Sequence, residues 1–337
     1  MTFESIRGQD GAIQSIRRAL GRGRLSHALI FAGPGGVGKG MAAHALATAL
    51  FCKNDPGLGC GACEDCHLME TGGHPDLFVE DLARAREEKP TASRLSIDQI
   101  RRTRSQLAMR GVRGNKKVGL IDQAELLSID AQNALLKTLE EPPGETTLVL
   151  VSTNADALLT TIRSRCQTLL FAPLERELLQ ELLVNDGTDP EVAKHAAALA
   201  EGSLDRARSL AAEGGLEYTA ELRGKLATLP KLRLPQVLDL AAELAAPRGE
   251  KGQAQQQLNR ATVLDWCRDQ LLEAARATES TDAAGTDDEA EAHDRLHEIR
   301  RALRRADRAY AINREFERNA NSHLAWDRLL LDLRESR

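Results

Sequence analysis

A glycine-rich octet near the N-terminus has the residue types of a phosphate-binding loop. The motif G-x-x-x-x-G-K-S/T binds phosphate oxygens through backbone N–H groups, reaches the β- and γ-phosphates with its lysine, and binds Mg²⁺ with its final hydroxyl. In this chain the final position is glycine, which has no hydroxyl. The octet therefore predicts a phosphate-loop fold in which binding of ATP or ADP is weak or absent. The candidate nucleotide-binding residues are Gly33, Gly35, Gly36, Val37, Gly38, Lys39 and Gly40.

The second half of the same site lies at the end of the segment Val118 to Asp122, which is apolar up to its final acid. In phosphate-loop ATPases an acid at the end of such a strand helps to hold Mg²⁺, so Asp122 is a candidate binding residue. The residue after this acid is normally Glu, which activates the attacking water, but here it is Gln123. An amide does not readily accept a proton, so general-base assistance of about 10²–10⁴-fold is lost.

Four cysteines form the pattern C-x7-C-x2-C-x2-C, which is typical of a structural zinc site with four sulfur ligands. These candidate metal ligands are Cys52, Cys60, Cys63 and Cys66. Two alternatives remain open, namely reduced free thiols, or replacement of one cysteine by His67 or His74. Cys166 and Cys267 have no such spacing and are expected to be ordinary buried residues.

Composition limits the class of protein. A chain of 337 residues with 42% hydrophobic residues can bury a core in two or three domains. No apolar run reaches about 18 residues and the N-terminus lacks an apolar signal core, so we expect a cytoplasmic protein that does not contact membranes. The net charge of -5 disfavours a self-sufficient, nonspecific nucleic-acid binder, so contact with DNA is expected to be local or shared with partners.

The order of elements predicts an α/β region followed by an all-α region. Helical segments at 41–50, 96–109 and 129–139 alternate with short apolar segments, as in a doubly wound parallel sheet. After Pro173 the pattern is helical to the end, with a turn at 187–190, a helix start at 202–203 and a joint at 214–215. The polar segment 278–291 is expected to be a mobile loop between two helices. The predicted strands are 27–32, 77–80, 118–122, 147–152 and 167–171.

Three further motifs resemble one known family, the clamp-loader branch of the AAA+ ATPases, which comprises the γ/τ and δ′ subunits of bacterial DNA polymerase III. The resemblance is strong over residues 1–212 and weaker beyond. It implies an AAA+ phosphate-loop domain at 1–172 with a zinc module inserted at about 52–75, a small helical lid domain at 173–213, and a helical collar domain at 214–337 that assembles a five-subunit ring. The motifs are Arg24-Leu25-Ser26-His27-Ala28, Asn133-Ala134-Leu135-Leu136-Lys137-Thr138-Leu139-Glu140-Glu141-Pro142-Pro143 and Ser164-Arg165-Cys166.

The resemblance gives Arg165 a catalytic role as an arginine finger that enters the ATP site of a neighbouring subunit. A guanidinium suits this role because it is always charged and binds phosphate through several donors. The alternatives are that Arg165 is a surface residue or pairs with a nearby acid. In the lid, the family's Gly-Ser-x-Arg arginine touches the nucleotide, whereas here Asp205 takes that place and Arg206 lies one position later. Thr153 and Asn154 occupy the place of the family's γ-phosphate sensor.

The resemblance therefore implies a ring subunit that loads the sliding clamp onto primed DNA with its δ and γ/τ partners, reaches DNA through the complex, and does not itself hydrolyse ATP. The alternative is an active γ/τ-like ATPase. The segment 318–326 also resembles an asparagine-rich turn that precedes the last helix in some subunits of this family. A basic cluster, for which a solvated helix face is at least as good an explanation as a DNA contact, comprises Arg101, Arg102, Arg104, Arg110, Arg113, Lys116 and Lys117.

Overall fold

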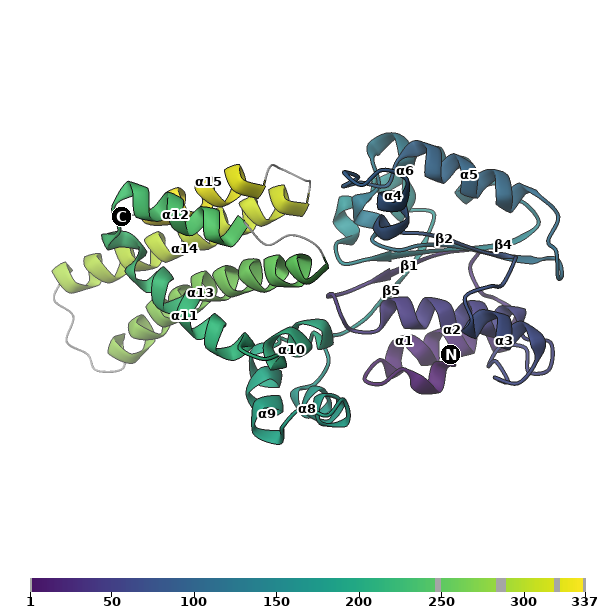
Figure 1. Cartoon of the computed structure of the whole chain (residues 1–337), viewed down its shortest axis with the longest axis horizontal. Helices are drawn as coiled ribbons and strands as arrows, with labels where there is room; N and C mark the ends of the chain where they lie inside the picture. Colours follow the sequence, from purple (N-terminus) through teal and green to yellow (C-terminus); the bar gives the residue numbers. More distant parts are fainter. Residues whose placement is uncertain (1, 246–249, 283–288, 318–321, 336–337) are drawn as a thin grey trace. The chain divides into compact units, whose positions relative to one another are not determined.

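The computed structural model describes residues 2–245, 250–282, 289–317 and 322–335, and it divides into two compact units (Figure 1). Unit 1 is Met1–Ala207 and unit 2 is Arg208–Arg337. All the strands of the described chain lie in unit 1, and the described elements after the last strand, β5 (Gln167–Leu170), are helical. The predicted order of an α/β region followed by an α region is confirmed.

Unit 1 is built on a parallel sheet of five strands in the order β2-β3-β4-β1-β5. All five residues of β1 are buried, since a strand covered on both faces needs apolar side chains on both sides. The five predicted strands all occur, with ends that differ by at most two residues. They are β1 Ala28–Ala32, β2 Leu77–Glu80, β3 Lys116–Ile121, β4 Glu145–Ser152 and β5 Gln167–Leu170.

Helices cover both faces of this sheet, with α1, α2 and α3 on one side and α4, α5 and α6 on the other (Figure 1). The start of α5 shows how local chemistry sets a boundary, because Ser96 and Gln99 form a reciprocal capping box there. Short 3-10 turns are η1 Phe3–Ser5, η2 Ala124–Leu126 and η3 Ala155–Ala157. The helices are α1 Asp10–Gly21, α2 Lys39–Phe51, α3 Glu64–Glu70, α4 Leu82–Glu88, α5 Ile97–Ala108, α6 Ile129–Glu140 and α7 Thr160–Arg163.

Three helices follow the sheet, namely α8 Arg176–Asn185, α9 Pro190–Leu199 and α10 Leu204–Ala211. The division between the two units falls inside α10, so the sheet, α8 and α9 belong to one compact unit. The predicted domain boundaries at 172 and 213 lie just after β5 and just before α11. The division into three domains stays a prediction.

Unit 2 is a helical body whose core includes the fully buried Trp326, with Val237 and Leu330 in the same apolar cluster. The expected loop at 278–291 is wrong at both ends, because 278–282 belong to α13 and 289–291 to α14. The second end is Glu-Ala-Glu, which consists of good helix formers; the first, Thr-Glu-Ser-Thr-Asp, is helical despite weaker formers. The middle of that segment, and the 318–321 part of the predicted asparagine-rich turn, lie outside the described residues. The elements are α11 Gly215–Thr228, η4 Leu229–Lys231, α12 Leu234–Ala245, α13 Glu250–Asp282, α14 Glu289–Glu317 and α15 Ser322–Glu335.

None of the described helices is both long enough and apolar enough to cross a membrane.

Candidate nucleotide and metal sites

The glycine-rich loop connects β1 to α2, as the sequence predicts. Gly38, in the left-handed region with φ of 94°, precedes the helix, and Lys39 is its first residue. Strand, loop and helix in this order aim the N–H groups of a helix N-terminus at the loop, which is the arrangement that binds phosphate. At Gly40 an added Cβ would meet no atom within 4 Å, so space does not account for the missing hydroxyl.

Lys39 is committed to the loop itself. The residue is only 5% exposed, and its Nζ donates to the carbonyl of Gly33 at 2.8 Å and to the carbonyl of Pro34. Burial lowers the pKa of Lys39, and the charges of Glu125, Asp122 and Asp205 oppose this effect. The ammonium group is thus bound by the carbonyls of its own loop, with three acids of this chain close enough to act on it.

Asp122 and Gln123 lie at the carboxyl end of β3. The Asp122 carboxylate accepts a hydrogen bond from the backbone N–H of Gln123 at 2.8 Å, and burial raises the pKa of Asp122. Sequence reasoning missed Glu125, whose carboxylate binds the hydroxyl of Thr153 at 2.6 Å and its N–H at 3.3 Å. The side chain of the expected sensor Thr153 is therefore bonded to a protein carboxylate. The sequence offered only one indication that Glu125 belongs to the site, namely that it is an acid two residues after Gln123.

The start of α10 packs directly on the glycine loop. The N–H of Leu204 donates to the carbonyl of Gly36 at 3.0 Å. A Cβ at Gly36, whose φ is 66°, would lie 2.7 Å from Ser203 Oγ and 2.9 Å from Asp205 Cγ. Asp205 therefore lies against the loop that would bind phosphates, where a carboxylate repels them. Arg206 instead pairs with Glu201 at 3.1 Å.

Arg165 lies in the segment between α7 and β5. Its Nη2 pairs with Oε1 of Glu140 at 2.7 Å, and its Nη1 donates to the carbonyl of Thr161 at 3.0 Å. Within this chain Arg165 therefore pairs with a nearby acid, which was one of the alternatives to its role as an arginine finger. The side chain is 37% exposed, so its guanidinium is also accessible from solvent. Sequence reasoning named the motif that contains Glu140 but gave this residue no role.

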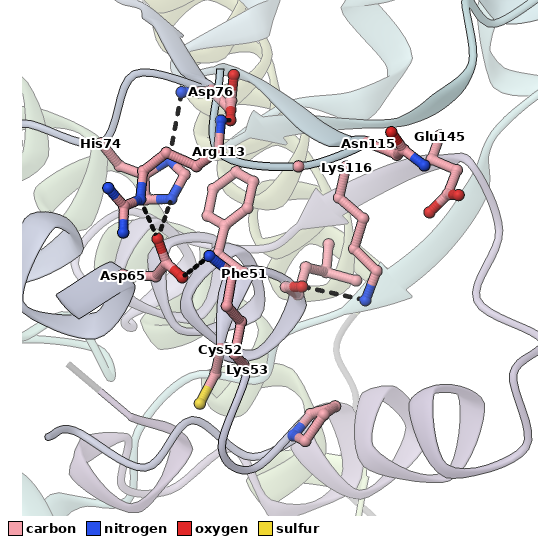
Figure 2. Close-up of a pocket in the computed structure, with 13 residues that line it drawn as sticks. Phe51, Cys52, Lys53, Asp65, His74, Asp76, Arg113, Asn115, Lys116 and Glu145 are labelled. Carbon is pink, nitrogen blue, oxygen red and sulfur yellow. Dashed lines mark hydrogen bonds and ion pairs between the residues drawn. The ribbon is translucent and has the colours of Figure 1, made fainter. Parts of the chain in front are cut away.

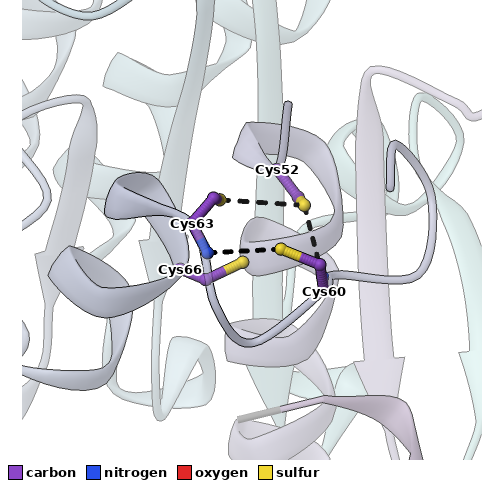
Figure 3. A group of neighbouring side chains, drawn as sticks. All are labelled: Cys52, Cys60, Cys63 and Cys66. Carbon is purple, nitrogen blue, oxygen red and sulfur yellow. Dashed lines mark hydrogen bonds between the residues drawn. The ribbon is translucent and has the colours of Figure 1, made fainter. Parts of the chain in front are cut away.

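The four predicted cysteines come together (Figure 3). Their sulfurs all lie within 4.8 Å of one another, and Cys63 Sγ is 3.9 Å from Cys52 Sγ. Zinc bound tetrahedrally at about 2.3 Å needs sulfurs about 3.8 Å apart, so the donor set fits this metal. Backbone N–H groups of Asp55 and Cys60 each donate to Cys52 Sγ at 3.3 Å. Such bonds stabilise a thiolate, which is the form that binds metal.

The thiols of this group differ in acidity. Burial raises the pKa of Cys63, but hydrogen bonds from Cys66, Lys53 and Cys60 outweigh it and lower the pKa to about 6. Burial raises the pKa of Cys66 to about 12. Among the described residues, the candidate metal ligands that lie together are the four cysteines. Neither His67 nor His74 belongs to this group, so the alternative in which a histidine replaces one cysteine is not supported. Cys267 is buried and Cys166 partly buried, and burial raises the pKa of each to about 12.

A buried ionic cluster fastens the cysteine loop to the sheet domain (Figure 2). Asp65, in α3, has a side chain only 3% exposed, and it pairs with Lys53 at 3.1 Å and with Arg113. His74 Nε2 lies 3.6 Å from Asp65, beyond hydrogen-bond distance, and burial lowers the pKa of His74. Hydrogen bonds from Arg113 and Lys53 overcome the effect of burial and lower the pKa of Asp65. The His74 ring stacks on Phe51 with centroids 3.8 Å apart. These residues line a cavity of about 380 Å³.

The predicted basic cluster is largely engaged within the chain. Lys117 is buried and donates to the carbonyls of Leu107 and Met109. Arg113 pairs with Glu64 and Asp65, and Arg102 pairs with Glu88 at 2.6 Å. These three of the seven cluster residues are thus bonded within the chain.

Comparison with known proteins identifies relatives of this chain. Residues 8–175 match the family model described as "DNA polymerase III, delta subunit". DNA polymerase III subunit delta′ of Bacillus subtilis is 33% identical over 186 residues, which is 55% of this chain and 54% of that protein. The delta′ subunit of Pseudomonas aeruginosa is 41% identical over 147 residues, or 43% of each chain. The tau subunit of Escherichia coli is 33% identical over 262 residues, covering 74% of this chain and 39% of that protein. The chain thus matches about half or less of the length of each relative.

Proposed function

This chain belongs to the family of DNA polymerase III delta subunits, as a delta prime-like clamp-loader subunit, and we propose from that premise that it does not hydrolyse ATP itself. It closes a ring of loader subunits and supplies Arg165 to the ATP site of a neighbour. Its partners are the δ and γ/τ subunits, and through the complex the sliding clamp and primed DNA.

The observation that carries the proposal is the different state of the two cations. Lys39 is 5% exposed and bound to two carbonyls of its own loop, whereas the Arg165 side chain is 37% exposed. A lysine must reach the β- and γ-phosphates to assist hydrolysis, and a finger must reach a phosphate from outside. The first cation is enclosed in its own pocket, whereas the second, although it is bonded to Glu140 and Thr161, is accessible to another molecule.

Three substitutions around the pocket support the loss of hydrolysis. Gly40 offers no hydroxyl to Mg²⁺, Gln123 cannot act as the base, and Asp205 brings negative charge to the glycine loop. We further propose that Cys52, Cys60, Cys63 and Cys66 hold a structural zinc ion, because their sulfur spacing fits it.

The second candidate function is an active, γ/τ-like ATPase. It is favoured by the alignment with the tau subunit of Escherichia coli, which extends over more of this chain than those with the two delta′ subunits. It predicts Mg²⁺-dependent turnover by the isolated protein that disappears in Lys39→Ala.

The test is ATP hydrolysis by a loader reconstituted with this chain, clamp and primed DNA. A finger in trans contributes about 10³–10⁵-fold at the site it serves. We therefore expect Arg165→Ala to lower the rate of the complex by about tenfold or more, while Lys39→Ala leaves it unchanged. Arg163→Ala is the matched control, since Arg163 lies two positions away and pairs with Asp156 at 2.6 Å. Activity that survived Arg165→Ala but fell with Lys39→Ala would establish the second function instead.

A further inference from the structure

The ion pair between Arg165 and Glu140 joins two of the family's sequence motifs. Glu140 is the last residue of α6, and Arg165 lies between α7 and β5. The 2.7 Å distance between Nη2 and Oε1 is that of a direct, charge-assisted hydrogen bond. The proposed finger is therefore held by a named carboxylate.

A second bond fixes the guanidinium from another side. Nη1 of Arg165 donates to the carbonyl of Thr161, in α7, at 3.0 Å. A guanidinium is planar and rigid, so two bonds to two of its nitrogens determine both its position and its plane. It has five N–H donors in all, which leaves others for phosphate oxygens.

The location of Glu140 is not explained by helix stability. The last carbonyls of a helix carry partial negative charge, so an acid there is unfavourable while a cation is favourable. The Glu140 side chain is 50% exposed, and an ion pair at such a site contributes little to folding. The contact therefore matters more for where Arg165 points than for whether the unit folds.

We propose that Glu140 is a positioning residue that orients the Arg165 guanidinium toward a phosphate of the nucleotide bound by a neighbouring subunit. This inference rests on the proposed function, because it gives Glu140 a task only if Arg165 acts in trans. Glu140 itself does not contact the nucleotide.

The experiment compares Glu140→Ala, Glu140→Gln, Arg165→Ala and the double variant Glu140→Ala/Arg165→Ala in the complete reconstituted loader. Small errors in placing a catalytic group cost up to about 10²-fold. We expect Glu140→Ala to lower kcat by about three- to tenfold without changing KM for ATP. Glu140→Gln keeps an oxygen acceptor without the charge, so we expect its kcat to lie between those of Glu140→Ala and the wild type. The double variant has the kcat of Arg165→Ala, because Glu140 acts only through Arg165.

Asp156→Ala is the control. It breaks the exposed Arg163–Asp156 pair, which is as short as the pair under test, and leaves kcat unchanged. Thermal melting of each variant excludes a folding defect.

The outcomes separate the two proposals. If Arg165→Ala is inactive but Glu140→Ala has the wild-type kcat, Glu140 has no positioning role and the proposed function stands. A raised kcat in Glu140→Ala means that Glu140 restrains the finger, and independent losses in the double variant mean that it acts elsewhere; either result overturns the inference. Full activity of Arg165→Ala overturns both proposals.

Discussion

Helix α2 connects the phosphate-loop motif at its N-terminal end to the cysteine group at its C-terminal end. The first motif lacks one of its ligand-binding residues, whereas the second has all four of its expected ligands. At the N-terminal end the glycine loop lacks the hydroxyl, its lysine binds the loop's own carbonyls, and α10 packs on Gly36. At the C-terminal end Cys52 begins a group of four sulfurs that all lie within 4.8 Å of one another. The helix between them buries five alanines together with Leu46, Thr48 and Phe51, so both ends are held by the same core.

The difference teaches that a motif can be kept for its fold without its chemistry. A phosphate loop positions a helix against a sheet whether or not phosphate binds, and here contacts from within the chain occupy it. Four thiols brought together have no comparable packing role, because clustered thiolates repel one another unless a cation is bound. We therefore expect ligand removal to affect only the cysteine end, and backbone crowding to affect only the glycine end.

The largest effect is expected at the cysteine end. Cys60→Ala removes one of the four ligands, and a structural zinc site contributes its binding free energy to folding. We expect the purified variant to lose its zinc and about 3 kcal/mol or more of unfolding free energy. Metal analysis and chemical denaturation, each with and without chelator, measure the two quantities.

Cys267→Ala is the control for this variant, since Cys267 is a buried thiol outside the metal group. It should keep its zinc and lose only packing energy. A wild-type protein that carries less than about half an equivalent of zinc, and whose stability is unaffected by chelator, would contradict the metal assignment.

An intermediate effect is expected for Gly36→Ala at the other end. The added methyl requires a left-handed residue, which costs about 1–2 kcal/mol, and it collides with Ser203 and Asp205, which costs about 1–3 kcal/mol more. We expect a loss of about 2–5 kcal/mol in unfolding free energy by chemical denaturation.

The neighbouring Gly35→Ala provides the comparison, because its methyl would meet only Thr153 Cγ2, at 4.0 Å. That variant should be close to the wild type. Equal stability of the two variants would mean that α10 does not pack on the loop in solution.

The fold was largely predictable from the sequence, because the parallel strands contain short apolar runs that stand out between helices, and this holds even for β5, most of whose residues are exposed. The cysteine group was predictable for a similar reason, since its ligands are close in sequence. The contacts of Glu140 with Arg165, and of Glu125 with Thr153, were not predictable. They depend on which loops the sheet order brings together, and a carboxylate has no periodic pattern that reveals its partner.

The smallest effect is expected for Gly40→Ser, which restores the hydroxyl that the loop lacks. The side chain fits without a clash, and serine is a better helix residue than glycine, so stability should rise by about 0.5 kcal/mol. We expect no Mg²⁺-dependent ATPase activity in the isolated protein. Lys39 remains bound to the carbonyls of Gly33 and Pro34, and Gln123 still cannot accept a proton.

Gly40→Ala is the matched control, because it also replaces glycine by a better helix former but adds no hydroxyl. Nucleotide binding measured with and without Mg²⁺ therefore isolates the contribution of the oxygen. If Gly40→Ser gained Mg²⁺-dependent binding or turnover that Gly40→Ala lacked, the pocket would need only its missing ligand. The difference between the two ends of α2 would then be due to a single missing oxygen. If instead Gly40→Ser and Gly40→Ala bind and hydrolyse nucleotide equally, then Lys39, Gln123 and Asp205 together keep the pocket inactive.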